Sequence, residues 1–135
     1  MGLISTLNKF KLSRELAAKQ VPFEGLALAL GQTQLIVPSL LLSEADKFDR
    51  LHQLVEENAS APSSETYSQM QAALVDVLFL SLKRNYPSIT SEYIKANLTT
   101  DQFLSAVLIL QRMNMPEVGR DIASETKSKV RSSGK

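Results

Sequence analysis

The feature that most constrains this chain is an apolar run, AALVDVLFLSL, over residues 72–82, which only two polar residues interrupt. Serines and Glu65 before the run suit the start of a helix, and Pro87 prevents that helix from continuing. Because apolar side chains would cover nearly all sides of the helix, several other elements must pack around it. The run is far shorter than the roughly 20 residues that cross a membrane. We therefore predict a buried central helix over about residues 65–85 in a soluble domain.

The composition fits one ordinary globular domain. The chain has 135 residues, of which 44% are apolar and 21% charged, and its net charge is +1. Charge is uneven, since residues 1–20 carry +3, residues 117–135 carry +2 and the middle carries −4. The absence of cysteine excludes disulfides and thiolate metal sites, and it suits a reducing cytoplasm, as does the absence of a segment of signal-peptide type. We predict a single mainly helical domain over residues 1–123 and a flexible basic tail over residues 124–135.

An amphipathic helix is predicted over residues 3–19. Leu3, Leu7 and Phe10 recur at helical spacing, and Leu12 and Leu16 are expected near the same stripe. Three interpretations stay open for this candidate arm over residues 1–20. It could lie on the core, lie on a membrane surface, or order itself only when a partner binds.

A small β-hairpin is predicted over about residues 25–37. Leucines alternate with alanines over residues 26–30, Gly31 and Gln32 offer a turn, and a second apolar run follows over residues 35–37. Two strands alone are marginally stable in water. The hairpin must therefore rest on the helices or lend its edge to another chain.

Three further helices are predicted from capping residues and apolar periodicity. The first covers about residues 44–57 with Ser43 as its N-cap, the second covers residues 91–97, and the third covers residues 101–113 with Thr99 or Thr100 as its cap. Most apolar side chains of the third helix are expected to be buried. These side chains are Phe103, Leu104, Val107, Leu108, Leu110 and Met113.

The residues that could carry chemistry do not form a catalytic pattern. His52 is the only histidine, and a zinc site needs more ligands than it and its neighbours supply, so we expect a solvated helix histidine. Asp76 is the one acid in the apolar run and is expected to reach the surface or to pair with Lys83, Arg84 or Arg112. The glycines are too scattered to cradle phosphate, and no nucleophile motif is present. We predict no enzyme activity, no cofactor and no metal.

Nucleic-acid binding receives little support from the sequence. A helical core of this size can hold a helix-turn-helix, but no predicted helix has the repeated Arg, Lys, Asn or Gln side chains that read base edges. The basic tail could add only weak, salt-sensitive attraction to phosphate. A small helical regulatory adaptor that binds protein or DNA is the rival interpretation.

Two stretches of the chain resemble the tail assembly chaperones of siphophages. The hairpin and the leucines after it, LALALGQTQLIVPSLLLSEADKFDRLHQL, are similar to the strand, turn, strand and helix start of that family. The stretch VDVLFLSLKRNYPSITSEYIKANLTTDQFLSAVLIL resembles its second signature, a buried helix that ends in Arg-Asn-Tyr-Pro and is followed by a short helix and a Leu-Thr-x-x-x-Phe helix. The resemblance covers about residues 25–112, and Arg84, Asn85, Tyr86 and Pro87 are its most specific part. It departs from the family at the turn, where Gly31-Gln32 stands in place of the frequent Gly-Gly or Gly-Lys.

The resemblance implies a phage protein of the host cytoplasm that holds the tape measure protein during tail assembly and is absent from the finished virion. In lambda-like members the short chaperone ends near a site of translational frameshifting, and Gly134-Lys135 is a dipeptide that such a slippery site could encode. The extended form would then recruit the tail tube protein, and self-association is expected.

The partner-binding residues are expected on the N-terminal stripe and on the hairpin, because these are the available apolar surfaces. The candidates are Leu3, Leu7, Phe10, Leu26, Leu28, Leu35 and Val37.

Overall fold

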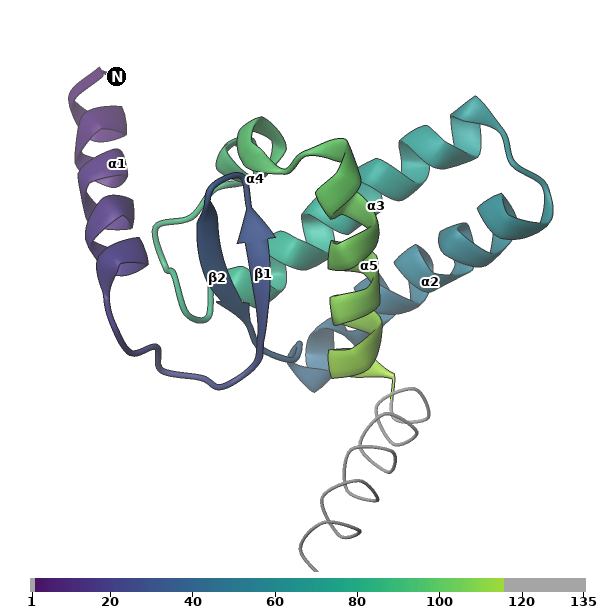
Figure 1. The fold of residues 1–135 in the computed structure, drawn as a ribbon, viewed down its shortest axis with the longest axis horizontal. Coiled ribbons are helices and arrows are strands. Elements are labelled where there is room, and N and C mark those ends of the chain that lie inside the picture. The colour runs from purple at the N-terminus through teal and green to yellow at the C-terminus, as the bar shows by residue number, and fades with distance from the viewer. Residues whose placement is uncertain (1, 116–135) are drawn as a thin grey trace, which may run out of the picture.

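The computed structural model describes residues 2–115, including the side chains of residues 7–115, and within them it is mainly helical with one two-stranded hairpin (Figure 1). The elements in chain order are α1 (Gly2–Ala17), β1 (Leu26–Leu30), β2 (Thr33–Val37), the 3-10 turn η1 (Leu42–Glu44), α2 (Ala45–Ser60), α3 (Ser64–Leu82), α4 (Ser91–Asn97) and α5 (Thr100–Asn114). The predicted fold class is thereby confirmed. The predicted tail over residues 124–135 lies outside the described residues.

The central helix of the fold is α3, which contacts α2, α4, α5 and β2. Its N-cap is Ser63, whose hydroxyl accepts a hydrogen bond from the Thr66 N–H at 3.0 Å. The helix ends at Leu82, three residues before the predicted end, with Lys83 as C-cap. Asp76 reaches the surface, as predicted. Six apolar side chains of α3 are buried, namely Met70, Leu74, Val75, Val77, Leu78 and Leu82.

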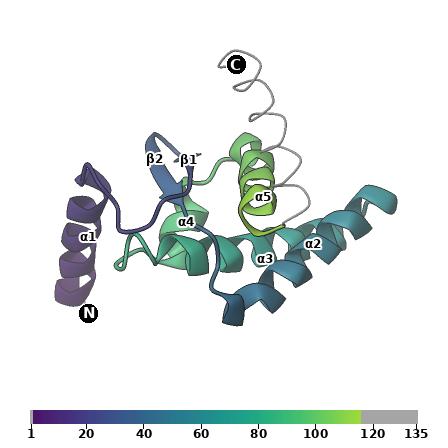
Figure 2. The same ribbon diagram turned by 90° about the horizontal axis from the view of Figure 1, so that it is seen from below.

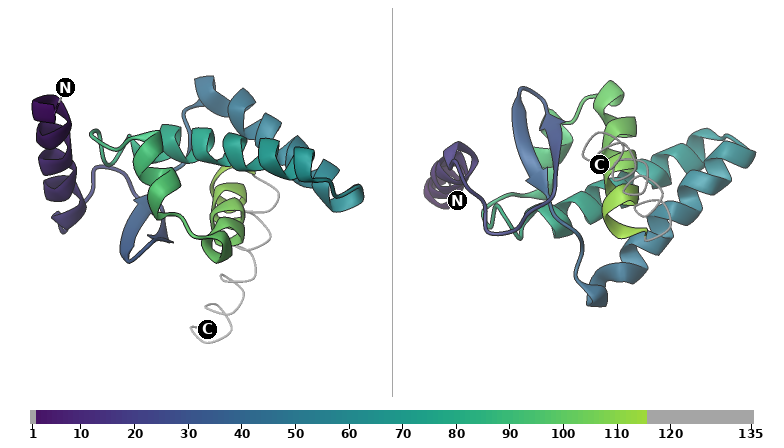
Figure 3. Two further views of the ribbon diagram at one scale, coloured as in Figure 1. Left: turned by 90° about the horizontal axis from the view of Figure 1, so that it is seen from above. Right: turned by 60° about the horizontal axis from the view of Figure 1, so that its bottom comes forward.

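The elements form two layers (Figures 2 and 3). α2 and α3 run side by side in one layer, where α2 buries Phe48, Leu51 and Leu54. The hairpin and α5 lie together on one side of that pair. The prediction of Ser43 as the N-cap of α2 is wrong, because Ser43 lies inside η1 and Glu44 takes the capping position. The Glu44 carboxylate instead accepts a hydrogen bond from the Leu41 N–H at 3.2 Å.

The hairpin is antiparallel, with Leu28 opposite Leu35 and Leu30 opposite Thr33. Gly31 has a φ of +64°, the left-handed conformation that the two-residue turn requires and that glycine adopts without steric cost. The core face carries four buried side chains, namely Leu28, Leu30, Leu35 and Val37. Alanine and leucine favour helices, so it is packing of this leucine face on the helices that stabilises a strand over residues 26–30.

α1 stands beside the rest of the fold (Figures 1 and 2). Leu12 is buried, Leu16 is half-buried, and the Glu15 carboxylate accepts hydrogen bonds from the Ser88 N–H at 2.9 Å and the Ser88 hydroxyl at 2.7 Å. Leu7 and Phe10 are exposed. The expectation that Leu12 shares their stripe is wrong, since Leu12 falls about 140–160° around the helix from both of them. α1 therefore has two apolar sides, of which one is attached to the core.

Candidate protein-binding surface

The Arg-Asn-Tyr segment after α3 fastens the hairpin to the core. Asn85 is 4% exposed and lies between two segments that precede it by about 50 to 60 residues. Its side-chain amide donates to the carbonyl oxygens of Phe23, at 2.9 Å, and Ile36, at 3.2 Å, and its oxygen accepts from the Phe23 N–H at 2.8 Å. The Tyr86 hydroxyl accepts from the Ile36 N–H at 2.8 Å. Both backbone groups of Ile36 are thereby occupied, so this part of the β2 edge is not available to a strand from a partner.

Arg84 completes this attachment. Its guanidinium donates to the Ser39 carbonyl oxygen at 2.6 Å and lies 4.1 Å from the centroid of the Phe23 ring. The Ser81 hydroxyl donates to the Pro38 carbonyl oxygen. These contacts hold the segments before β1 and after β2 against the end of α3. Arg84, Asn85 and Tyr86 therefore have a structural role in this chain, and the Arg84 guanidinium already has contacts within it.

The seven candidate partner-binding residues occupy three kinds of position. Leu7 and Phe10 are 51% and 61% exposed on α1, and Leu26 is half-buried. The side chain of Leu3 lies outside the described part of the chain. The structure corrects the prediction for the remaining three. Leu28, Leu35 and Val37 are at most 1% exposed, because the hairpin turns its leucine face to the core, and no partner can reach them while the fold is closed.

α5 carries two exposed leucines that were not among the predicted binding residues. Leu104 and Leu108 are 67% and 59% exposed, although both were expected to be mostly buried. α5 lies on the outside of the fold and buries only the side that carries Phe103, Ala106, Val107 and Leu110. The exposed side also carries Asp101 and Arg112, but leucines on both sides of the helix conceal this arrangement in the sequence. The spacing of four residues puts Leu104 and Leu108 on one face, which we call the α5 face.

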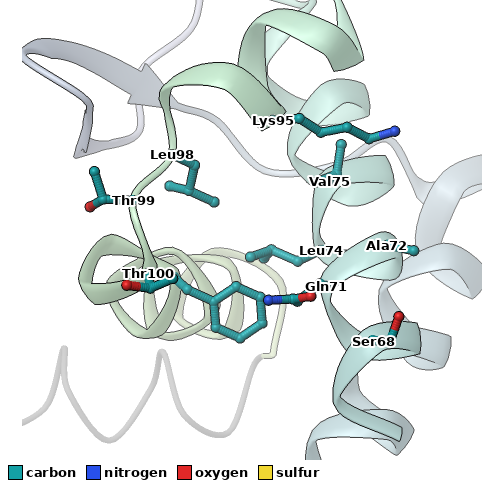
Figure 4. Close-up of a pocket in the computed structure, with 10 residues that line it drawn as sticks. Ser68, Gln71, Ala72, Leu74, Val75, Lys95, Leu98, Thr99 and Thr100 are labelled. Atoms are coloured by element: carbon teal, nitrogen blue, oxygen red, sulfur yellow. The ribbon is translucent and has the colours of Figure 1, made fainter. Parts of the chain in front are cut away.

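Two features lie next to Phe103, on the buried side of α5. The half-exposed ring of Tyr67, on α3, packs 5.6 Å from the ring of Phe103. Beyond Phe103 a pocket of about 350 Å³ opens between α3 and the connection from α4 to α5. Leu74 and Leu98 project into it from these two elements (Figure 4). Lys95 is the only charged residue among those that line the pocket, so the pocket offers apolar contact and no acid-base pair.

Two titratable groups in the described part of the chain have specific side-chain contacts. The His52 ring stacks on Phe48, and its Nε2 lies 3.0 Å from a carboxylate oxygen of Glu56. Hydrogen bonds from the Thr99 hydroxyl and from the backbone to the Asp101 carboxylate lower the pKa of Asp101, which is fully exposed. Over residues 2–115, no group of three or more His, Asp or Glu side chains is placed to hold a metal ion.

Comparisons with protein-family models, with curated proteins and with solved structures find no match to this chain. None of the helices in the described part of the chain has both the length and the apolar character to span a membrane.

Proposed function

We propose that the chain is a phage tail assembly chaperone that binds the tape measure protein in the host cytoplasm during tail assembly and is absent from the mature virion. The resemblance over residues 25–112 supports this function. The structural observation that carries it is the α5 face, because two leucines one turn apart are exposed on a rigid helix of the outer layer.

The chemistry of the α5 face suits a helical partner. A tape measure protein is long, helical and apolar, and an amphipathic helix presents apolar side chains at the same spacing as Leu104 and Leu108. Two leucines bury little area, so each contact is weak and reversible. Many copies bound along one long partner would protect it collectively, and each copy could still leave when the tail tube assembles.

A longer form of the chain, translated past Lys135 by frameshifting, would recruit the tail tube protein. The described domain would be common to both forms and would supply the tape measure contact.

The rival function is a regulatory adaptor that binds protein or DNA, and its DNA-binding form receives no support from the two cationic residues at the end of α3. Arg84 is committed to Ser39 and Phe23, and the Lys83 ammonium lies 5.5 Å from the ring centroid of Phe79. Neither Lys83 nor Arg84 is accompanied by the further Arg, Lys, Asn or Gln side chains that recognition of nucleobase edges needs.

The test is co-expression of the tagged chain with the tape measure protein encoded in the same genome, followed by affinity capture. We expect the wild-type chain to capture the tape measure protein and the double variant Leu104→Glu, Leu108→Glu to lose it. Gln53→Glu, on the exposed side of α2, is the matched control and should retain capture. Equal capture by the double variant would exclude the α5 face as the site. A wild-type chain that captures no tape measure protein would overturn the proposed function.

A further inference from the structure

The exposed side of α5 carries charges as well as leucines. Five exposed residues of this helix fall within about 100° of its circumference and form one line along it. We call this set the α5 stripe, and it consists of Asp101, Leu104, Ser105, Leu108 and Arg112. The acid lies in the first turn of α5 and the cationic residue in its last turn. The stripe is therefore apolar in the middle, negative at its N-terminal end and positive at its C-terminal end.

The spacing along the α5 stripe creates two holes for the side chains of another helix. Residues at positions i, i+3, i+4 and i+7 of one helix form the hole that receives a side chain of a packed neighbour. The first hole lies between residues 101, 104, 105 and 108, and the second lies between residues 105, 108, 109 and 112. Leu108 gives both holes an apolar wall, and the small side chain of Ser105, which they also share, leaves room in them. Two apolar side chains from one face of a partner helix fit these positions.

The two charged ends of the stripe have no opposite charge beside them in the part of the chain that the structure describes. Over residues 7–115 the only ion pair joins His52 to Glu56. Asp101 accepts a hydrogen bond from the Thr99 hydroxyl, but its carboxylate stays exposed, and Arg112 is exposed as well. Both charges are therefore accessible to a partner.

The order of these charges selects the direction of the partner helix. An antiparallel helix places its N-terminal end beside Arg112 and its C-terminal end beside Asp101. Charge complementarity then requires an acid near its N-terminal end and a cation near its C-terminal end, and the macrodipole of the partner helix favours the same arrangement. A parallel helix would need the reverse order, which its own macrodipole opposes. The antiparallel direction is therefore favoured.

We propose that the α5 stripe binds an antiparallel amphipathic helix of a second protein, with an acid opposite Arg112, a cationic residue about eleven positions later opposite Asp101, and two apolar side chains between them in the holes. The source of this helix is taken from the proposed function, which makes it a segment of the tape measure protein. The contact extends over about 17 Å of α5, since each residue adds about 1.5 Å to a helix.

α5 of a second copy of the chain has its charges in the same order but offers little surface. Each copy would contribute two leucines, whereas stable interfaces bury about 1,200 Å² or more. α5 has 15 residues, so a contact between two copies of it ends with the stripe. A helix from a long partner continues past both ends of the stripe and adds contact there. The second protein is therefore the better occupant.

The test maps the contact with photo-crosslinkers, to which the chain is suited because it contains no cysteine. Asp101→Cys and Arg112→Cys are each labelled with a benzophenone maleimide, captured with the tape measure protein and irradiated, and mass spectrometry identifies the linked residues. We expect both positions to link to the same segments of the tape measure protein. In each segment the residue linked to position 112 should precede the residue linked to position 101 by about 9 to 13 positions. Gln53→Cys, on the exposed side of α2, is the matched control and should not link to these segments.

The reverse order of the linked residues would overturn the proposal, and so would capture of the tape measure protein without links from either position of the stripe. Links from position 112 to position 101 of a second copy, or to residues 116–135 of the same chain, would assign the stripe another occupant and overturn it too. The proposed function survives each of these results, because capture is measured separately. A wild-type chain that captures no tape measure protein would overturn the proposed function and this proposal together.

The charges provide a second test. Arg112→Glu should weaken the affinity for the tape measure protein by at most about fivefold, because the ion pair is exposed to solvent. Replacing the tape measure acid that is mapped opposite Arg112 by lysine should restore the affinity, since the reversed charges again face each other. Arg50→Glu, at an exposed position of α2, is the matched control and should bind like the wild type. Failure of the rescue, with circular dichroism showing both proteins folded, would contradict the assigned direction of the helix.

Discussion

The Tyr86 hydroxyl lies 2.8 Å from the backbone nitrogen of Ile36 and joins the residue that follows α3 by four positions to the outer edge of β2. The contact spans 50 residues of sequence and is part of the attachment that also includes Asn85 and Arg84. A two-stranded hairpin is marginal alone, so its stability in this chain depends on such contacts as well as on its leucine face.

Asn85→Ala should destabilise the domain by about 2–4 kcal/mol, since it removes a buried side chain and leaves partly buried backbone groups of Phe23 and Ile36 without partners. Urea unfolding followed by circular dichroism measures the change. Asn8→Ala, at an exposed position of α1, should shift the unfolding free energy by less than about 0.5 kcal/mol. A similar small shift for Asn85→Ala would contradict the proposed attachment.

Tyr86→Phe keeps the ring and removes only the acceptor for the Ile36 N–H. We expect a loss of about 1–2 kcal/mol, the cost of leaving one buried donor without a partner. Tyr67→Phe is the control, because Tyr67 is exposed and its ring contact does not require the hydroxyl. In hydrogen exchange the Ile36 amide should lose protection in the Tyr86 variant alone.

Leu110 and Leu108 distinguish the two sides of α5. Leu110 is fully buried and Leu108 is 59% exposed, although both were predicted to be mostly buried. Leu110→Ala should cost about 2–5 kcal/mol in unfolding free energy, whereas Leu108→Ala should change it by less than about 0.5 kcal/mol. Equal losses for the two variants would mean that Leu108 is buried like Leu110, which would contradict the exposure of this side of α5.

The sequence predicts where the helices and strands of this fold lie better than it predicts which side of each one is buried. Periodicity and capping residues locate α3, α4 and α5 to within a few residues, because caps and prolines act locally. The prediction that Leu104 and Leu108 are buried was wrong because both sides of α5 carry leucines, and only the position of the other elements decides which leucines are covered. The same reason explains why Leu12 was wrongly expected on the stripe of Leu7 and Phe10 in α1.

The role of the Arg-Asn-Tyr segment could not be predicted from the sequence. Asn85 and Tyr86 act through backbone groups of Phe23 and Ile36, and a backbone group leaves no signal in the residue type that carries it. The binding candidates Leu28, Leu35 and Val37 were wrong for a related reason, since alternation identifies the apolar side of a hairpin but not what that side packs against.

Thr99→Ala should raise the pKa of Asp101 back toward its ordinary value of 3.8, because the Thr99 hydroxyl is the first of the contacts that lower it. A carboxylate with a lowered pKa stabilises the folded state at pH values above its unfolded pKa, and this contribution disappears as the pH falls through the folded pKa. NMR titration of the Asp101 side chain measures the shift. Thr100→Ala should leave the titration unchanged, and an unchanged titration in Thr99→Ala would contradict the assignment.

Glu15→Ala should release α1 from the rest of the fold while leaving the core intact. The substitution removes both hydrogen bonds to Ser88, so that the buried side of Leu12 and the half-buried Leu16 remain as the described attachments. We expect hydrogen exchange of the α1 amides to approach that of a free helix, whereas amides of α3 keep their protection, because regions with few buried contacts open independently of the core. Lys19→Ala, at an exposed position after α1, is the control and should leave both sets of amides unchanged. If α3 lost protection together with α1, then α1 would belong to the cooperative core, and the view of it as a helix held at one side only would fail.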